Sequence, residues 1–244
     1  MITRTGDWSP VLFSLSVTMR RNIKLIFFLF SCIAAMNVRS QSAIMDLFKK
    51  KQLDSIMQAD QMYRPVFRAL LDPAKRDSLT GFHKMPAEQI ELVYDSLQEA
   101  LDSTNLLFIE RFIALYGYPG KSMVGEPTNE VAWYVIQHSD KIARYFSIIQ
   151  EAGKRKEIPY RLVAMMQDRL LVEQQKKQLY GTQIARRRLK DSKEEVMFVW
   201  PVKQPCFVNR RRKKAGFETT VEQNAKRFHI EYKKVRLKDI QPLS

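Results

Sequence analysis

The sequence predicts a mainly α fold, in which one compact helical domain carries a small β-hairpin near its C-terminus. Apolar residues recur at helical spacing in successive stretches between residues 42 and 180. Only 182–188 and 196–202 have strand-like composition, and the polar residues 190–195 separate them as a hairpin turn would. Apolar residues make up 45% of the chain, too many for a disordered protein.

The first 40 residues are predicted to be an N-terminal extension and signal peptide, which leaves 41–244 as the single folded domain. Arg20, Arg21 and Lys24 form a basic segment, and the apolar run that follows ends at Met36. This run has signal-peptide length and is short for a membrane-spanning helix. We therefore expect cleavage after residue 40, a periplasmic or secreted protein, and no stable transmembrane segment after cleavage.

Two features of this segment leave alternatives open. Residues 29–32 resemble a bacterial lipobox, so a lipoprotein anchored at Cys32 is one alternative to cleavage, and an uncleaved anchor helix is another. Met19 directly precedes the basic pair, so either Met1 or Met19 is the true start.

Export also decides how the charge is interpreted. The whole chain has a formal net charge of +15, and removal of 1–40 takes away five Lys/Arg and one Asp, which leaves +11. In a cytosolic protein such a surplus would suggest nucleic acid, whereas in an exported protein it favours anionic envelope components or a small polar ligand as partners. We expect no nucleic-acid partner. Cys206 alone remains after cleavage, so no internal disulfide is expected.

The elements follow from periodicity and from residues that begin or end helices. Residues 72–82 are polar with Pro73 and Gly81 and are interpreted as a loop, and 102–105 are interpreted as a turn or N-cap that interrupts a helix. Residues 209–216 are basic and have no assigned element. Helices are expected over 42–58, 87–116, 129–138, 140–153, 159–181 and 220–228.

The stretch 165–183 is the best candidate for a site. Asp168 shares a helix face with Met165, Leu171 and Val172, where an unpaired carboxylate would cost several kcal/mol. It is expected to face inward, ionised, with at least one arginine as partner. One interpretation is a buried ion pair, and the other is a carboxylate held for proton transfer or ligand binding. The arginines considered as partners are Arg64, Arg169, Arg211 and Arg212.

The helix of Asp168 is expected to stop at the turn 180–183. A helix stop needs a glycine with positive φ, but it does not need this many hydrogen-bonding groups. The turn is therefore predicted to lie near the carboxylate and to take part in binding, and its candidate residues are Gln178, Tyr180, Thr182 and Gln183.

His138 lies on an otherwise apolar helical face with Val131 and Val135. A lone histidine there is usually a hydrogen-bonded core residue, but a break at Ser139 would bring it and Asp140 towards one pocket. The three histidines lack a known ligand spacing, so no metal site and no cofactor are predicted. The sequence also contains no phosphate-binding loop and no nucleophile elbow.

Six motifs occur in an order that resembles a bacterial family known as domain of unknown function 6624. They span roughly residues 55–228, and Phe217 stands where leucine is expected. The resemblance implies a mainly helical domain and no established activity. The motifs are Asp60-Gln61-x-x-Arg64, Tyr116-Gly117-x-Pro119, Gln137-His138-x-Asp140, Asp168-Arg169, Gln178-x-Tyr180-Gly181-Thr182-Gln183 and Arg211-Arg212-x-x-x-Gly216-Phe217.

The sequence thus favours an exported protein with a polar pocket that binds a ligand or associates with the envelope. The alternative is a metal-independent hydrolase-type enzyme, in which His138 acts with Asp140 or Asp168. A purely structural role for the polar residues is a third interpretation, and whether the protein is an enzyme stays open.

Overall fold

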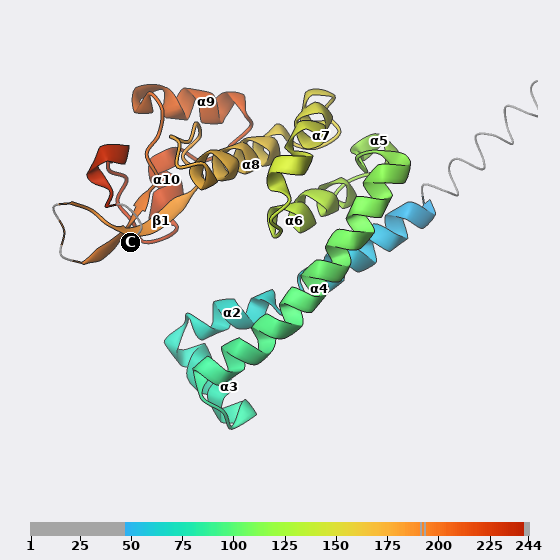
Figure 1. Ribbon diagram of the computed structural model, residues 1–244, viewed down its shortest axis with the longest axis horizontal. Helices are drawn as coiled ribbons and strands as arrows, with labels where there is room; N and C mark the ends of the chain where they lie inside the picture. Colours follow the sequence, from blue (N-terminus) through green and yellow to red (C-terminus); the bar gives the residue numbers. More distant parts are fainter. Residues whose placement is uncertain (1–46, 191, 193, 242–244) are drawn as a thin grey trace, which may run out of the picture. The chain divides into compact units, whose positions relative to one another are not determined.

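The computed structural model describes residues 47–190, 192 and 194–241. The chain divides into two compact units, 1–49 and 50–244, and the second carries the fold and the candidate site residues. It is mainly helical with a small two-stranded antiparallel hairpin, which confirms the predicted fold class (Figure 1). The predicted signal peptide, Met19 and Cys32 lie outside the described residues.

A helix over 47–60 is followed by α2 (Arg64–Leu70), α3 (Pro73–His83) and the long α4 (Ala87–Tyr116). The short elements α5 (Lys121–Val124), η1 (Thr128–Glu130) and α6 (Val131–Gln137) lead to α7 (Ile142–Lys154) and α8 (Tyr160–Glu173). The hairpin consists of β1 (Ile184–Arg188) and β2 (Glu195–Val199). The chain then forms η2 (Pro205–Phe207), α9 (Val208–Lys214), α10 (Val221–Lys226) and η3 (Leu237–Asp239).

Two predicted interruptions in the first half are wrong. Residues 73–83 form α3 instead of a loop, because the Asp72 carboxylate caps the N–H groups of Ala74 and Lys75 and Pro73 occupies the first helical position. The expected turn at 102–105 is part of α4. Asp102 does not act as an N-cap there, because its side chain is hydrogen-bonded to Arg64 and Gln98 instead.

Two further differences lie in the second half. The helix expected to run to Gly181 ends at Glu173, and Gln175 takes the left-handed conformation with φ 54°. The segment 174–183 is therefore a turn-rich strap that leads into β1 rather than a continuation of α8. Most of the basic stretch 209–216, for which no element was predicted, belongs to α9, which ends at Lys214.

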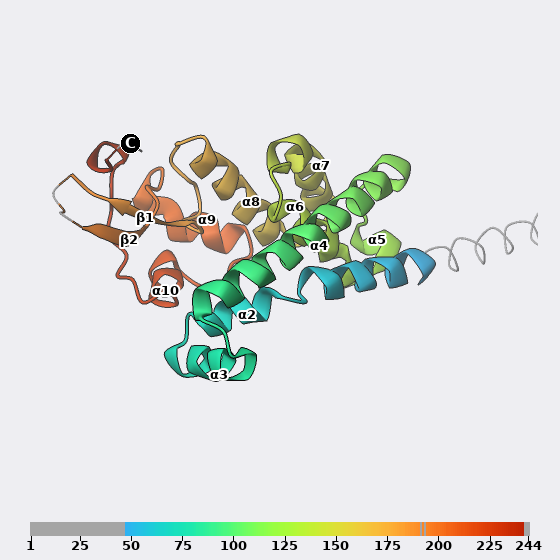
Figure 2. The same ribbon diagram turned by 60° about the horizontal axis from the view of Figure 1, so that its bottom comes forward.

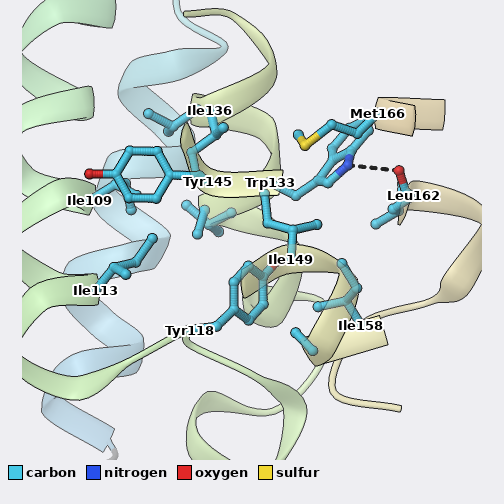
Figure 3. Close-up of a cluster of buried hydrophobic side chains, with 14 of the residues drawn as sticks. Ile109, Ile113, Tyr118, Trp133, Ile136, Tyr145, Ile149, Ile158, Leu162 and Met166 are labelled. Carbon is cyan, nitrogen blue, oxygen red and sulfur yellow. Dashed lines mark hydrogen bonds between the residues drawn. The ribbon is translucent and has the colours of Figure 1, made fainter. Parts of the chain in front are cut away.

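The larger core lies between residues 53–57 and α4 to α8. Trp133 is buried at its centre, and its indole N–H donates to the carbonyl of Leu162 at 2.9 Å (Figure 3). The pairs α4–α6, α6–α7 and α7–α8 pack directly on one another. The residues labelled around Trp133 are Ile109, Ile113, Tyr118, Ile136, Tyr145, Ile149, Ile158, Leu162 and Met166.

A smaller core joins the hairpin to the C-terminal helices. Val199, Val202, Val208 and Val221 are its buried members, together with Ala225. Figure 2 shows β1, β2, α9 and α10 at the same end of the ribbon. The strands pair in antiparallel register from Ile184 opposite Val199 to Arg188 opposite Glu195. Within the described part of the chain, none of the helices combines the length and the apolar composition that crossing a membrane requires.

Candidate functional site

Asp168, on the last turns of α8, is fully buried. One carboxylate oxygen accepts from the N–H of Leu179 at 2.7 Å, and both oxygens contact the N–H of Tyr180 at 3.0 and 3.1 Å. The second oxygen also accepts from the N–H and the hydroxyl of Thr182, each at 3.0 Å. The carboxylate therefore holds the N–H side of the turn that follows α8.

The carbonyl side of the same turn is held by side chains from α9 and α10. Arg211 Nε donates to the carbonyl of Leu179 at 2.8 Å, and Arg212 Nη1 donates to that of Tyr180 at 2.9 Å. Asn224 Nδ2 donates to the carbonyl of Gly181 at 3.3 Å. Since these groups act on one turn from both sides, we call the set Asp168, Gln178, Thr182, Arg211, Arg212 and Asn224 the turn clamp.

Gln178 closes the remaining end of the clamp. Its side chain is fully buried, and its Nε2 donates to the carbonyls of Gln183 and Trp200 at 2.9 and 2.7 Å. Its Oε1 accepts from the N–H of Gln183 at 2.9 Å. Gly181 has φ 67°, and a Cβ there would lie 2.5 Å from a methyl group of Val221, so only glycine fits this turn.

The turn clamp explains why polar residues gather around Asp168. The predicted inward orientation of Asp168 and its contact with the turn are found. The buried Arg212 interacts with the Asp168 carboxylate through its charge, but no direct ion pair between Asp168 and an arginine occurs in the part of the chain that the structure describes. Arg211 and Arg212 bind carbonyl groups, and Arg169 lies on the surface, 3.3 Å from Glu173. Burial raises the pKa of Asp168, while the donors from Leu179, Thr182 and Tyr180 oppose that rise.

A second polar group surrounds His138, which follows α6. Its Nδ1 lies 3.0 Å from Oδ1 of Asp60, a residue that is 1% exposed. Its Nε2 lies 3.2 Å from Nε2 of Gln137. With the proton on Nδ1, both contacts are satisfied: Nδ1–H donates to Asp60, and Nε2 accepts from the Gln137 amide.

Arg64 links Asp60 to a second carboxylate. Its Nη2 lies 3.2 Å from Asp60 Oδ1 and 2.7 Å from Asp102 Oδ1. Gln98 donates from Nε2 to Asp102 at 2.8 Å and to the carbonyl of Asp60 at 3.2 Å. We call Asp60, Arg64, Gln98, Asp102 and His138 the His138 cluster.

Burial is the largest single influence on the pKa of Asp60, but the groups bound to the carboxylate together outweigh it. Burial alone would raise its pKa, but the hydrogen bonds from His138 and Arg64 and their charges outweigh it, so the pKa lies below its usual range. Asp60 is therefore ionised at neutral pH.

The structure separates residues that the sequence grouped together. His138 pairs with Asp60 and not with the predicted Asp140 or Asp168. The Asp140 side chain is 78% exposed and lies 3.0 Å from Lys141, because the turn after α6 directs it to solvent. Arg64, a candidate partner of Asp168, belongs to the His138 cluster instead.

Asp60, Asp102 and Gln98 were missed as possible site residues. Asp102 and Gln98 are four residues apart on α4, and Asp60 and Arg64 are likewise four apart. Once 102–105 is assigned to a helix, this spacing places Gln98 and Asp102 on one face of α4. Asp60 ends one helix and Arg64 begins the next, so only the first pair had a local signal in the sequence. The wrong interruption of α4 concealed it.

A cleft of about 570 Å³ opens beside the turn clamp. Thr182 and the buried Arg212 form part of its floor, and the Arg212 guanidinium lies 4.4 Å from the centre of the Phe217 ring. The other lining residues are Arg161, Met165, Gly216, Glu218, Thr219, Asn224, Arg227 and Phe228.

The cleft has a basic rim. Arg161 Nη2 lies 3.3 Å from Glu130, and the Arg161 side chain is still 43% exposed. Arg227 is exposed, and no ion pair of its guanidinium occurs among the described residues. Three guanidinium groups thus line a cavity to which Glu218 contributes the only lining carboxylate among the described residues.

Comparison with known proteins supports the resemblance noted in the sequence. A family described as "Family of unknown function (DUF6624)" matches residues 69–232. The chain belongs to this family. The match includes the whole turn clamp, the cleft and His138, but it begins after Asp60 and Arg64. No curated protein and no solved structure matches the chain.

Proposed function

We propose that this DUF6624 member is an exported protein that binds a small anionic ligand in the cleft beside the turn clamp. The observation that carries the proposal is the basic lining of a cleft of about 570 Å³ by Arg161, Arg212 and Arg227. Guanidinium groups recognise carboxylate and phosphate oxygens by paired hydrogen bonds. The volume suits a small molecule, since ligand sites commonly have roughly 300–1,000 Å³.

The arginines have different roles in this proposal. Arg212 is buried and three of its nitrogen atoms already donate to Tyr180 and Thr219, so it supplies positive charge from the floor. Arg227 and Arg161 reach solvent, so they make the direct contacts with the anion. The apolar part of the ligand lies against Met165, Phe217 and Phe228, which line the same cleft.

The alternative of an acid–base enzyme has weaker support. A base needs a free ring nitrogen and space for a substrate, whereas both ring nitrogens of His138 have partners. The cleft is not lined by His138 or Asp60. For these reasons we base the proposed function on the cleft and not on the histidine.

Titration calorimetry of the purified protein with inorganic phosphate, pyrophosphate, citrate and a sugar phosphate tests the proposal. We expect at least one of these anions to bind with one site per chain. Arg227→Gln should weaken binding by about 10–100-fold, because a hydrogen bond to a charged group contributes roughly 1.5–3 kcal/mol. Arg188→Gln, which changes an exposed arginine of β1 outside the cleft, is the matched control.

The outcome separates a built site from general attraction. Equal losses in Arg227→Gln and Arg188→Gln would show that only net charge attracts the anions. Absence of binding to every anion would overturn the proposal. If the bound group belongs to a lipid of the envelope, vesicles with anionic headgroups should compete with the soluble anion for the cleft.

Export has its own test. N-terminal sequencing of the protein from envelope or periplasmic material should begin near Gln41. A cytosolic protein with an intact Met19 would contradict export, and a lipid on Cys32 would identify the lipoprotein alternative. Neither result bears on anion binding by the purified protein.

A further inference from the structure

The His138 cluster has no role in the proposed anion site, and its composition raises a separate question. Asp60 ends the first helix, Asp102 lies on α4 and His138 follows α6, and one ligand atom of each lies within 4.8 Å of the others. Their positions in the sequence are 42 and 36 residues apart, so no spacing motif could have indicated the group. We propose that these three side chains form a binding site for a divalent first-row metal ion such as Mn²⁺, Co²⁺ or Zn²⁺.

The charge of the cluster favours a divalent cation. With His138 neutral, the two carboxylates carry two negative charges, and Arg64 supplies one positive charge between them. A divalent ion that replaced the guanidinium would balance both carboxylates. Arg64 is able to leave, since its side chain is 22% exposed and α2 has no buried residue.

Gln98 provides an independent observation. The residue is only 4% exposed, and its amide nitrogen already donates within the cluster, to Asp102 and to the carbonyl of Asp60. Its Oε1 is buried and has no hydrogen-bond partner. The amide nitrogen, not this oxygen, now faces Asp102 and the carbonyl of Asp60. Turning the amide over when a cation replaces Arg64 would direct the oxygen to the ion, and an amide oxygen is a good ligand for a hard cation.

The type of donor restricts the choice of metal. One imidazole nitrogen with carboxylate oxygens suits Mn²⁺, Co²⁺ and Zn²⁺, whereas the cluster contains no thiolate that would select a softer ion. Binding places the metal on Nδ1 of His138, so the ring proton moves from Nδ1 to Nε2 and the imidazole stays neutral. Nε2–H is then a donor, so the Gln137 amide, whose nitrogen now faces Nε2, has to turn over and present its oxygen. That hydrogen bond would keep the ring oriented, as outer hydrogen bonds do in metal sites.

Substitution of Arg64 gives a specific test of the metal site, because it is expected to strengthen metal binding. If a metal and the guanidinium compete for the same carboxylates, Arg64→Gln should bind the metal about tenfold more tightly than the unaltered protein. Asp102→Asn and His138→Gln should each weaken binding by about tenfold or more. His229→Gln, which removes an exposed histidine elsewhere, should leave the affinity unchanged.

The measurement is titration of the EDTA-treated protein with Mn²⁺, Co²⁺ and Zn²⁺, with metal content per chain determined after dialysis. Imidazole resonances of His138 in the unaltered protein, broadened by Mn²⁺ or shifted by Co²⁺, provide a readout that does not depend on a variant folding. We expect one metal ion per chain and a selective effect on His138. Lack of binding by both the unaltered protein and Arg64→Gln, or undiminished binding by a folded His138→Gln, would overturn the proposal.

The two proposals are separable. Arg227→Gln should keep its metal affinity, and His138→Gln should keep its anion affinity, because the metal ligands and the cleft share no residue. A variant that loses anion binding should therefore still bind the metal, and a variant that loses metal binding should still bind the anion.

Discussion

Asp168 and Asp60 are both almost inaccessible to solvent, but different groups hold them. Asp168 accepts mainly from backbone N–H groups of one turn, and the carbonyls of that turn are bound by Arg211, Arg212 and Asn224. Asp60 is held by side chains, those of Gln61, Arg64 and His138. A carboxylate bound by backbone fixes the path of the chain, whereas one bound by side chains can exchange its partners without unfolding.

This difference separates a structural role from a functional one. In the turn clamp, nearly every polar group has a partner within the protein, so little remains to bind a ligand. In the His138 cluster a buried amide oxygen of Gln98 has no partner, and a solvent-accessible arginine lies between two carboxylates. The motif residues around the turn are thus best explained by folding, and ligand binding is left to the cleft beside them.

The largest expected effect is on stability at the turn clamp. Asp168→Ala would leave the N–H groups of Leu179, Tyr180 and Thr182 buried without an acceptor, so the free energy of unfolding should fall by about 3–5 kcal/mol. Chemical denaturation measures this change. Arg169→Ala, which breaks only a surface pair with Glu173, should change stability by less than about 1 kcal/mol. An equal decrease in the free energy of unfolding in the two variants would contradict the structural role assigned to Asp168.

Substitution of Arg212 should lower the free energy of unfolding by a smaller amount. Arg212→Gln removes donors from the carbonyls of Tyr180 and Thr219, which should lower the free energy of unfolding by about 1.5–3 kcal/mol. The neighbouring Arg210 is exposed, so Arg210→Gln is the matched control and should unfold like the unaltered protein. If Arg212→Gln is as stable as the unaltered protein, Arg212 does not stabilise the fold and contributes only its charge to the cleft.

His138 should affect stability less than either clamp residue. His138→Gln loses the hydrogen bond to Asp60, but Arg64 and Gln61 still satisfy that carboxylate, so a loss of roughly 1 kcal/mol is expected. Thermal unfolding in EDTA is the measurement. If this variant loses as much stability as Asp168→Ala, the contrast between the two regions fails and His138 is a structural residue.

The smallest effect is the pH dependence, and its sign differs between the two aspartates. The pKa of Asp60 is lowered in the folded state, so its contribution to stability is present above the unfolded value of 3.8 and is lost as the pH falls towards the folded pKa. The pKa of Asp168 is raised, so its contribution is present below 3.8 and is lost as the pH rises through the folded pKa.

Denaturation in EDTA across the acid range tests both signs. The stability difference between the unaltered protein and Asp60→Asn should grow as the pH rises from 3 to 6, whereas the difference for Asp168→Asn should shrink. Parallel curves for the two variants would contradict the opposite pKa shifts.

The sequence by itself determined the fold class, the hairpin and the region of the turn clamp. Helical periodicity and the helix stop at Gly117 are local signals, and so are the glycine turn at Gly181 and the pairing of two strand-like stretches across a short polar segment. An inward-facing Asp168 also followed from local pattern, because its neighbours on the helix face are apolar.

Only the tertiary structure decided the partners of the polar residues. Asp60, Asp102 and His138 meet because the helix 47–60, α4 and α6 pack together, and such contacts leave no trace in local spacing. The partner of Asp168 was mistaken for the same reason. The sequence showed that a buried carboxylate needs compensation, but backbone N–H groups occur at every residue except proline, so composition could not reveal that the turn itself would supply them.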